Sequence, residues 1–98
     1  MANLIPSNLY VYGHERAGKR SRRTRLEICA QILEYLQFNL LRLSEIAFYV
    51  GLNYKAAKRY VELLMKNNLI NAVKKNGKTY YVATLSGRKF IKHFEEIN

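Results

Sequence analysis

Residues 43–70, LSEIAFYVGLNYKAAKRYVELLMKNNLI, constrain the fold more than any other segment of this chain. The first part suits a short apolar helix, which Gly51 can end because glycine adopts a positive φ at little cost. Asn53 then fits as the N-cap of a further helix that continues to about residue 67. Ala47 and Ala57 are small enough to let the two helices cross closely. The segment therefore predicts two helices joined by a tight turn.

Apolar stripes predict the other helices. One helix is expected over residues 22–37 and the last from Thr84 onward, because apolar side chains recur there at helical spacing. The stripes consist of Ile28, Cys29, Ile32, Leu33 and Leu36 in the first helix, of Ala57, Val61 and Leu64 after the tight turn, and of Phe90, Ile91, Phe94 and Ile97 in the last helix. Cys29 is the single cysteine, and we expect it to be a small buried hydrophobe in a reducing, intracellular setting.

A β-hairpin is predicted between the last two helices. Two runs of β-forming residues flank Asn76-Gly77, the pair best suited to a two-residue type I′ turn. Lys74, Lys75 and Lys78 gather at its tip. The fold class is thus α+β and mostly α, with three helices, a two-stranded hairpin and a C-terminal helix. The expected domains are a basic N-terminal arm at 1–21 and a folded domain at 22–98.

Charge is the strongest global feature. The 98 residues carry a formal net charge of +10, and all seven acidic residues are Glu. A large positive excess predicts attraction to a polyanion, most often nucleic acid, with an anionic membrane surface as the other candidate. No apolar run approaches the roughly 20 residues of a membrane span, and the N-terminus lacks the pattern of a signal peptide. A cytoplasmic, nucleoid-associated protein is expected.

Residues 13–21, GHERAGKRS, partly match the phosphate-binding loop of nucleotide hydrolases. Gly13, Gly18 and Lys19 occupy its fixed positions. Such a loop needs a hydroxyl after the lysine and a distant acid, usually Asp, to hold Mg²⁺. Arg20 takes the hydroxyl position, and the chain has no Asp. We therefore interpret the segment as part of a basic arm, and expect neither an enzyme nor a cofactor nor a metal site.

From these elements the chain resembles the winged helix-turn-helix DNA-binding proteins, and looks closest to small basic archaeal ones, including transcription regulators and chromatin-associated proteins. The resemblance covers about residues 22–97 and rests on SEIAFYVGLNYKAAKRYVELLMKNNLI and KNGKTYYVAT–SG. Asn68 stands where the family usually has Gly, a mild departure because Asn tolerates a left-handed φ. Close archaeal relatives dimerise through a long final helix, whereas the last helix here offers at most about two heptads.

The resemblance implies that the helix after the turn enters the major groove of duplex DNA and that the hairpin reaches the flanking backbone. The basic arm could lie in an adjacent groove. The candidate DNA-binding residues are Arg16, Lys19, Arg20, Arg22, Arg23 and Arg25 in the arm and the residues after it, Asn53, Tyr54, Lys55, Lys58 and Arg59 on the helix, and Lys74, Lys75 and Lys78 on the hairpin.

Other interpretations of these residues stay open. Lys58 and Arg59 could form an ordinary solvated helix face, and the hairpin lysines could protect a sheet edge from aggregation. Alternation along the strand would place one of Tyr80 and Tyr81 in the core and the other at the surface, and Tyr54 could read bases or only pack beside the turn. His14 and His93 suggest no metal site.

The sequence predicts sequence-specific binding of double-stranded DNA by a transcription regulator, archaeal or of an archaeal virus. The alternatives are a chromatin-type protein of low specificity, an RNA- or ribosome-associated protein, and a protein-interaction module. A homodimer is expected, formed by the aromatic segment LYVY at residues 9–12 together with the last helix.

Overall fold

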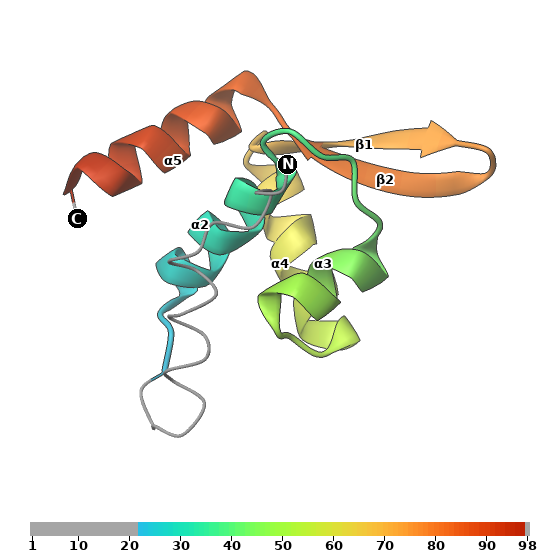
Figure 1. Cartoon of the computed structure of the whole chain (residues 1–98). Coiled ribbons are helices and arrows are strands. Elements are labelled where there is room, and N and C mark those ends of the chain that lie inside the picture. Colours follow the sequence, from blue (N-terminus) through green and yellow to red (C-terminus); the bar gives the residue numbers. More distant parts are fainter. Residues whose placement is uncertain (1–21, 98) are drawn as a thin grey trace.

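The computed structural model describes residues 22–97. A group of three helices carries a two-stranded hairpin that extends to one side, while the last helix lies on the other side (Figure 1). In chain order the elements are α2 (Arg25–Leu36), α3 (Leu43–Val50), α4 (Tyr54–Lys66), β1 (Ile70–Lys75), β2 (Lys78–Ala83) and α5 (Leu85–Ile97). The predicted α+β, mostly helical class and the predicted order of elements are confirmed.

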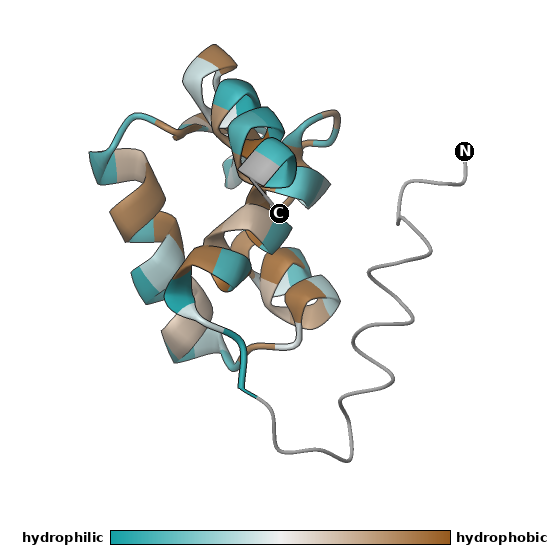
Figure 2. Ribbon diagram, turned by 90° about the vertical axis from the view of Figure 1, so that its left-hand side faces the viewer, coloured by the Kyte–Doolittle hydropathy of each residue, from teal (hydrophilic) through white to brown (hydrophobic). Residues whose placement is uncertain are grey.

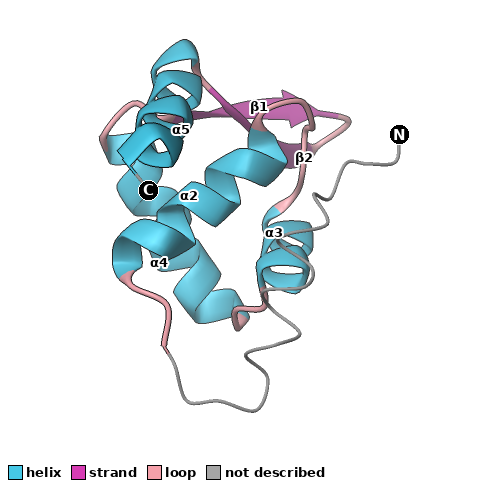
Figure 3. Cartoon of the chain, turned by 60° about the vertical axis from the view of Figure 1, so that its left-hand side comes forward, coloured by secondary structure: helices cyan, strands magenta, loops and turns pink. Residues whose placement is uncertain are grey.

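The core lies where α2 meets α3, α4, the base of the hairpin and α5 (Figure 3). The helices each carry hydrophilic and hydrophobic residues, as expected for elements with one face in the core (Figure 2). The largest fully buried side chains are Ile32, Leu33, Leu36, Ile46, Val61, Leu64 and Ile70. Cys29 is buried as predicted, and burial raises the pKa of its thiol, opposed in part by the charge of Arg25.

Local capping groups fix the ends of the helices. The Thr24 hydroxyl accepts a hydrogen bond from the Glu27 amide at 3.0 Å, and the Glu27 carboxylate accepts one from the Thr24 amide at 2.9 Å. This capping box starts α2 at residue 25, three residues later than the periodicity suggests, because the N-cap itself is extended. Gly51 ends α3 with φ 75°, and Asn53 caps α4 by accepting from the Ala56 amide at 2.8 Å, both as predicted.

The hairpin also follows its local sequence. Its strands pair in antiparallel register from Ile70 opposite Ala83 to Lys75 opposite Lys78. Asn76 and Gly77 both have positive φ, 52° and 76°, as a type I′ turn requires.

One pairing in this sheet was not predicted. The Leu41 amide donates to the Tyr81 carbonyl at 3.1 Å, and the Tyr81 amide donates to the Leu41 carbonyl at 2.8 Å. The connection between α2 and α3 therefore forms a short bridge to β2 and holds the start of α3 beside the hairpin.

The last helix is attached to the core through its first turn. Thr84 donates its hydroxyl to the Asn68 carbonyl at 2.8 Å and accepts from the Gly87 amide at 3.0 Å. Asn68 has φ 59°, in agreement with its predicted left-handed tolerance. Ile91 is buried, while Phe90 and Phe94 are half-buried and stack with ring centroids 6.4 Å apart. Much of the predicted apolar stripe of α5 therefore packs within the same chain.

Candidate nucleic-acid interface

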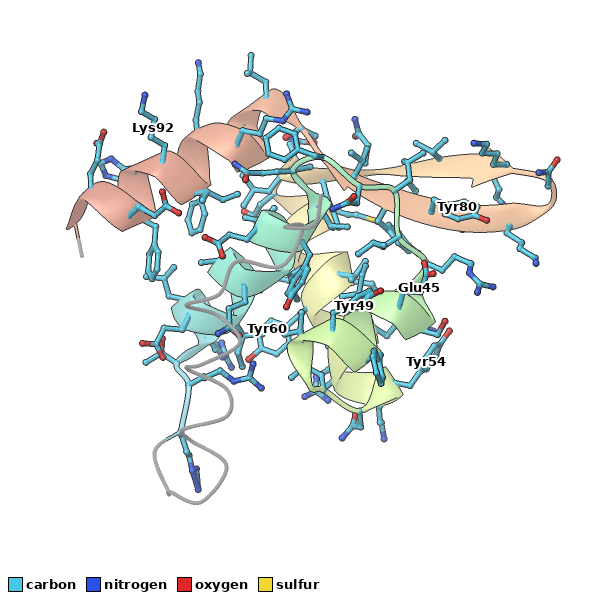
Figure 4. All side chains as sticks on the ribbon, viewed as in Figure 1. Glu45, Tyr49, Tyr54, Tyr60, Tyr80 and Lys92 are labelled. Carbon is cyan, nitrogen blue, oxygen red and sulfur yellow. The ribbon has the colours of Figure 1, made fainter. Side chains whose placement is uncertain are left out.

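A groove of about 430 Å³ lies between α4, the start of α3 and β2. Its lining residues are Arg42, Leu43 and Ser44 at the start of α3, Tyr54, Lys58, Val61, Glu62 and Met65 on α4, and Lys78, Thr79 and Tyr81 on β2. Tyr54 lies on the same side of the molecule as the hairpin (Figure 4). The groove thus joins the helix and the hairpin that carry most of the predicted binding residues outside the arm.

The charge of this groove favours an anion. Three cations, Arg42, Lys58 and Lys78, line it together with one carboxylate, Glu62. It also opens at the first residues of α3, where the helix dipole adds positive potential that the Glu45 carboxylate in the first turn offsets in part. A linear polyanion can follow such a groove from the helix to the hairpin.

Two tyrosines line the groove as well. The Tyr54 side chain is 58% exposed, so it is accessible to a ligand, and its contact with DNA stays a prediction. Tyr81 is half-buried and packs against the core, and burial, with smaller contributions from Tyr54 and Glu62, raises its pKa. Tyr80 is also half-buried but is not among the residues that pack against the core, so the predicted division holds in direction although neither tyrosine is fully buried or fully exposed. The twisted two-stranded hairpin has only its base against the core, and neither face of β2 is fully covered.

The outer face of α4 is basic. Lys55, Lys58 and Arg59 are all exposed, because the opposite face carries the buried side chains Ala57, Val61 and Leu64. The Asn53 Oδ1 atom is already engaged as the N-cap acceptor. A contact from Asn53 to DNA therefore stays a prediction, and only its side-chain amide group is left to make it.

The hairpin tip concentrates positive charge. Lys74, Lys75 and Lys78 are exposed, and Lys75 lies directly opposite Lys78 in the register. Like charges opposite each other destabilise a sheet, so this pair costs the folded protein stability unless an anion lies close by. The arrangement agrees with a role of the tip in binding a polyanion.

Arg23 makes contacts within the fold. Its guanidinium donates to Gln31 Oε1 at 2.6 Å and to the Val50 carbonyl at 2.8 Å, and reaches the Gly51 carbonyl at 3.5 Å. It therefore holds the start of the described chain against the turn between α3 and α4. Its contact with DNA stays a prediction, and no local pattern pointed to this internal role.

The other basic residues near the arm divide into two groups. Arg22 and Arg25 are exposed, and Arg25 lies with Arg59, Tyr60 and Leu63 around a second hollow of about 230 Å³. Figure 4 shows Tyr60 on the side of α4 away from Tyr54. Arg16, Lys19 and Arg20, and with them the segment resembling a phosphate loop, lie outside the described residues, as does His14.

The sequence analysis did not assign several of the lining residues to the site, among them Arg42, Ser44 and Thr79. Arg42 precedes α3, and its amide donates to the Glu45 carboxylate at 2.8 Å. The spacing of Arg42 and Glu45 is a recognisable sign of a helix start, but only the bridge from Leu41 to Tyr81 brings this start beside the hairpin.

The described residues offer little for other kinds of site. His93 is exposed, and in residues 22–97 no group of three or more His, Cys, Asp or Glu side chains is arranged to hold a metal ion. None of the helices in this part of the chain is both long and apolar enough to cross a membrane.

Comparison with known proteins identifies the fold independently. Residues 22–98 match the family model described as winged helix-turn-helix. No curated protein sequence matches the chain.

Solved structures resemble the chain over most of its length. Sso10a-2, a DNA-binding protein from Sulfolobus solfataricus, has a TM-score of 0.69 and 27% identity over 76% of this chain and 78% of its own. MepR of S. aureus, in a complex with DNA, has a TM-score of 0.64 and 18% identity over 93% of this chain and 73% of its own. The adhesin competence repressor of Streptococcus pyogenes has a TM-score of 0.66 and 16% identity, with 92% and 66% covered. By its family match, its element order and its basic helix and hairpin, this chain belongs to the winged helix-turn-helix family.

Proposed function

We propose that this protein binds double-stranded DNA in a sequence-specific manner and regulates transcription, without an enzymatic activity of its own. The observation that carries the proposal is the continuous groove in which the exposed lysine of α4, Lys58, and the hairpin lysine, Lys78, line the same surface. The Sulfolobus relative described as a DNA-binding protein and the MepR–DNA complex support it, since both share this fold.

The recognition helix in this proposal is α4. Its 13 residues make a rod of about 20 Å, and the major groove of B-DNA, about 12 Å wide, admits a helix. Tyr54, Lys55 and Lys58 project from its first half, where base edges and phosphates are met, and Arg59 follows on the outer face. Sequence preference would come from base contacts by these side chains, because contacts to phosphate carry no sequence information directly.

The hairpin and the arm supply contacts to the backbone. Lys74, Lys75 and Lys78 reach the flanking phosphates or the minor groove while α4 lies in the major groove. The exposed Arg22 stands at the start of the described chain, next to the anchored Arg23 and hence beside the turn that precedes α4. Residues Arg16, Lys19 and Arg20 would extend from there along the duplex, with Arg25 at the base of the arm.

We also propose a homodimer, as helix-turn-helix regulators commonly read two half-sites about one turn of DNA apart. The last helix contributes one side of the interface. Leu85 is 66% exposed and Phe90 is half-buried. Residues 9–12, which the sequence predicts at the same interface, lie outside the described residues. Sedimentation equilibrium of the intact chain and of the Phe90→Lys variant tests this part of the proposal.

Selection of bound sites from random duplex DNA, followed by fluorescence anisotropy at several salt concentrations, tests the proposed function. The double variant Lys55→Ala, Lys58→Ala should lose affinity and selectivity, whereas the control Lys89→Ala, Lys92→Ala changes two exposed lysines of α5 and should bind as before. Equal affinity for all sequences would instead indicate a chromatin-type protein. A preference for duplex RNA would contradict the proposal, because the A-form major groove is too narrow for α4.

A further inference from the structure

Two exposed aromatic side chains lie on α3, and one of them stacks on the buried Tyr35 of α2. Phe48 is 81% exposed and Tyr49 is 42% exposed. Tyr49 stacks on Tyr35 of α2 with ring centroids 5.4 Å apart, and Phe48 meets Tyr49 edge to face at 5.6 Å. We call these three residues the aromatic patch. An aromatic ring as exposed as that of Phe48 leaves apolar area in water that a partner could bury.

The aromatic patch is separate from the proposed DNA groove. None of its three residues is among those that line the groove. Tyr49 is turned toward α2, whereas the groove lies where α3 meets α4 and the hairpin (Figure 4). Binding of DNA in the groove therefore leaves the function of Phe48 and Tyr49 unexplained.

The N-terminal segment joins the described fold close to this patch. The guanidinium of Arg23 is bonded to the carbonyl of Val50, the residue that directly follows Tyr49. The residues before Arg23 therefore join the fold near the C-terminal end of α3, within one turn of helix from Phe48.

The sequence before that point contains one apolar segment of matching chemistry, LYVY at residues 9–12. The nine residues 13–21 separate it from Arg22. A linker of nine residues spans up to about 30 Å when extended. All of α3, with its 8 residues, is only about 12 Å long. The segment can thus reach any part of the patch on its own subunit.

We propose that residues 9–12 dock on the aromatic patch of the same subunit, with Tyr10 and Tyr12 available to pack against Phe48 and Tyr49. A tether of this length gives an effective concentration of about millimolar, well above the micromolar concentration of a second copy in solution. This favours the segment of the same subunit as the occupant.

Docking would close residues 13–22 into a loop beside the turn that precedes α4. That loop carries Arg16, Lys19, Arg20 and Arg22. Fixing both of its ends restricts where these cations can lie relative to the DNA groove, so that less ordering entropy is lost when DNA binds. The proposal leaves α5 as the contact in the proposed dimer and takes residues 9–12 out of that interface.

Disulfide trapping in the full chain tests the docking. The test variant carries Val11→Cys and Ser44→Cys in a Cys29→Ala background, since the exposed Ser44 lies one helical turn from Phe48 and leaves the patch intact. The control carries Val11→Cys with Ser86→Cys, at an exposed position on α5. Mild oxidation at micromolar concentration should give an intramolecular disulfide in about tenfold higher yield in the test variant, a ratio equivalent to about 1.4 kcal/mol.

Two further variants separate docking from chance encounter. Adding Phe48→Ser to the test variant should lower the yield to that of the control, and Phe48→Tyr should restore it. Because Phe48 is so exposed, both variants should keep the circular dichroism spectrum of the parent. Equal yields in the test and control variants would overturn the proposal. A mainly intermolecular disulfide would also overturn it, and would place the segment on a second copy instead.

Discussion

The carboxyl groups of Glu34 in α2 and Glu95 in α5 hydrogen-bond to each other across the interface between the two helices. Burial raises the pKa of Glu34 to about 7, and the hydrogen bond and the negative charge of Glu95 act in the same direction. A hydrogen bond between two carboxyl groups needs a proton on one of them, so the protonated form of Glu34 is favoured. This one contact between α2 and α5 therefore depends on protonation.

This pair makes stability depend on pH. The pKa of Glu34 rises from 4.5 to about 7 on folding, so the folded protein binds the additional proton between these values, and its stability declines as the pH rises through them. Glu34→Gln removes the repulsion. Because the side chain is only half-buried, solvent screening limits the gain to about 1 kcal/mol at pH 8. The gain should vanish at pH 4.

Urea unfolding of the parent and Glu34→Gln at both pH values measures this effect. The exposed Glu96 of α5 provides the control, and Glu96→Gln should leave the pH dependence unchanged. A gain from Glu34→Gln of the same size at pH 4 and pH 8 would show that packing and not protonation is responsible.

Removal of the Arg23 guanidinium should destabilise the fold. Arg23→Ala leaves the Val50 carbonyl and Gln31 without their donor, and a hydrogen bond from a charged group contributes about 1.5–3 kcal/mol. Because Arg23 is half-exposed, we expect a loss near 1 kcal/mol, or about 4–8 °C in Tm. Thermal unfolding measures it, and Arg22→Ala serves as the exposed control. An equal loss in both variants would count against the structural role of Arg23.

Gly87 should not tolerate a side chain. A Cβ atom there would overlap with the Leu69 carbonyl oxygen, which accepts a hydrogen bond from the Thr84 amide at 3.0 Å. Gly87→Ala should therefore lose about 1–3 kcal/mol, although alanine is the better helix former. Denaturant unfolding measures the loss. In the control, Ser86→Ala, the neighbouring side chain is exposed, and the change should stay within about 0.5 kcal/mol.

Glu62 should weaken DNA binding. It is the one carboxylate among the residues described as lining the groove, and it faces the same space as Lys58 and Lys78. Glu62→Gln removes its repulsion of phosphate and should raise affinity up to about fivefold at low salt. The gain should shrink as salt screens the charge. Anisotropy titrations compare it with Glu96→Gln on α5, and a similar gain in both variants would indicate a general charge effect.

The binding should depend steeply on salt. With roughly 6–10 phosphate contacts, affinity falls about a thousandfold or more between 50 and 200 mM salt. Deletion of residues 1–21 removes Arg16, Lys19 and Arg20, and should flatten the logarithmic salt slope by up to about 3 while weakening binding to all sequences alike. Circular dichroism checks that the helices persist. A nearly flat salt dependence of the intact chain would refute the proposed electrostatic interface.

The sequence by itself determined the elements and most of their ends. Gly51, Asn53 and the pair Asn76-Gly77 adopt the conformations that their residue types favour, and the apolar stripes of α2 and α4 are the faces that are buried. These features depend on backbone preferences and side-chain periodicity within a few residues. Such local properties can be predicted without knowledge of the rest of the fold. The family resemblance followed from their order.

The tertiary structure alone decided which distant residues meet. Arg23 was assigned to DNA because its sequence neighbours are basic, yet it bonds to Val50, 27 residues further along. Arg42 and Thr79 line the same groove because the bridge from Leu41 to Tyr81 brings the start of α3 to the hairpin. The raised pKa of Glu34 beside Glu95 likewise arises only where α5 packs on α2. Such contacts depend on how the helices pack, and a local pattern carries no information about residues that approach from far along the chain.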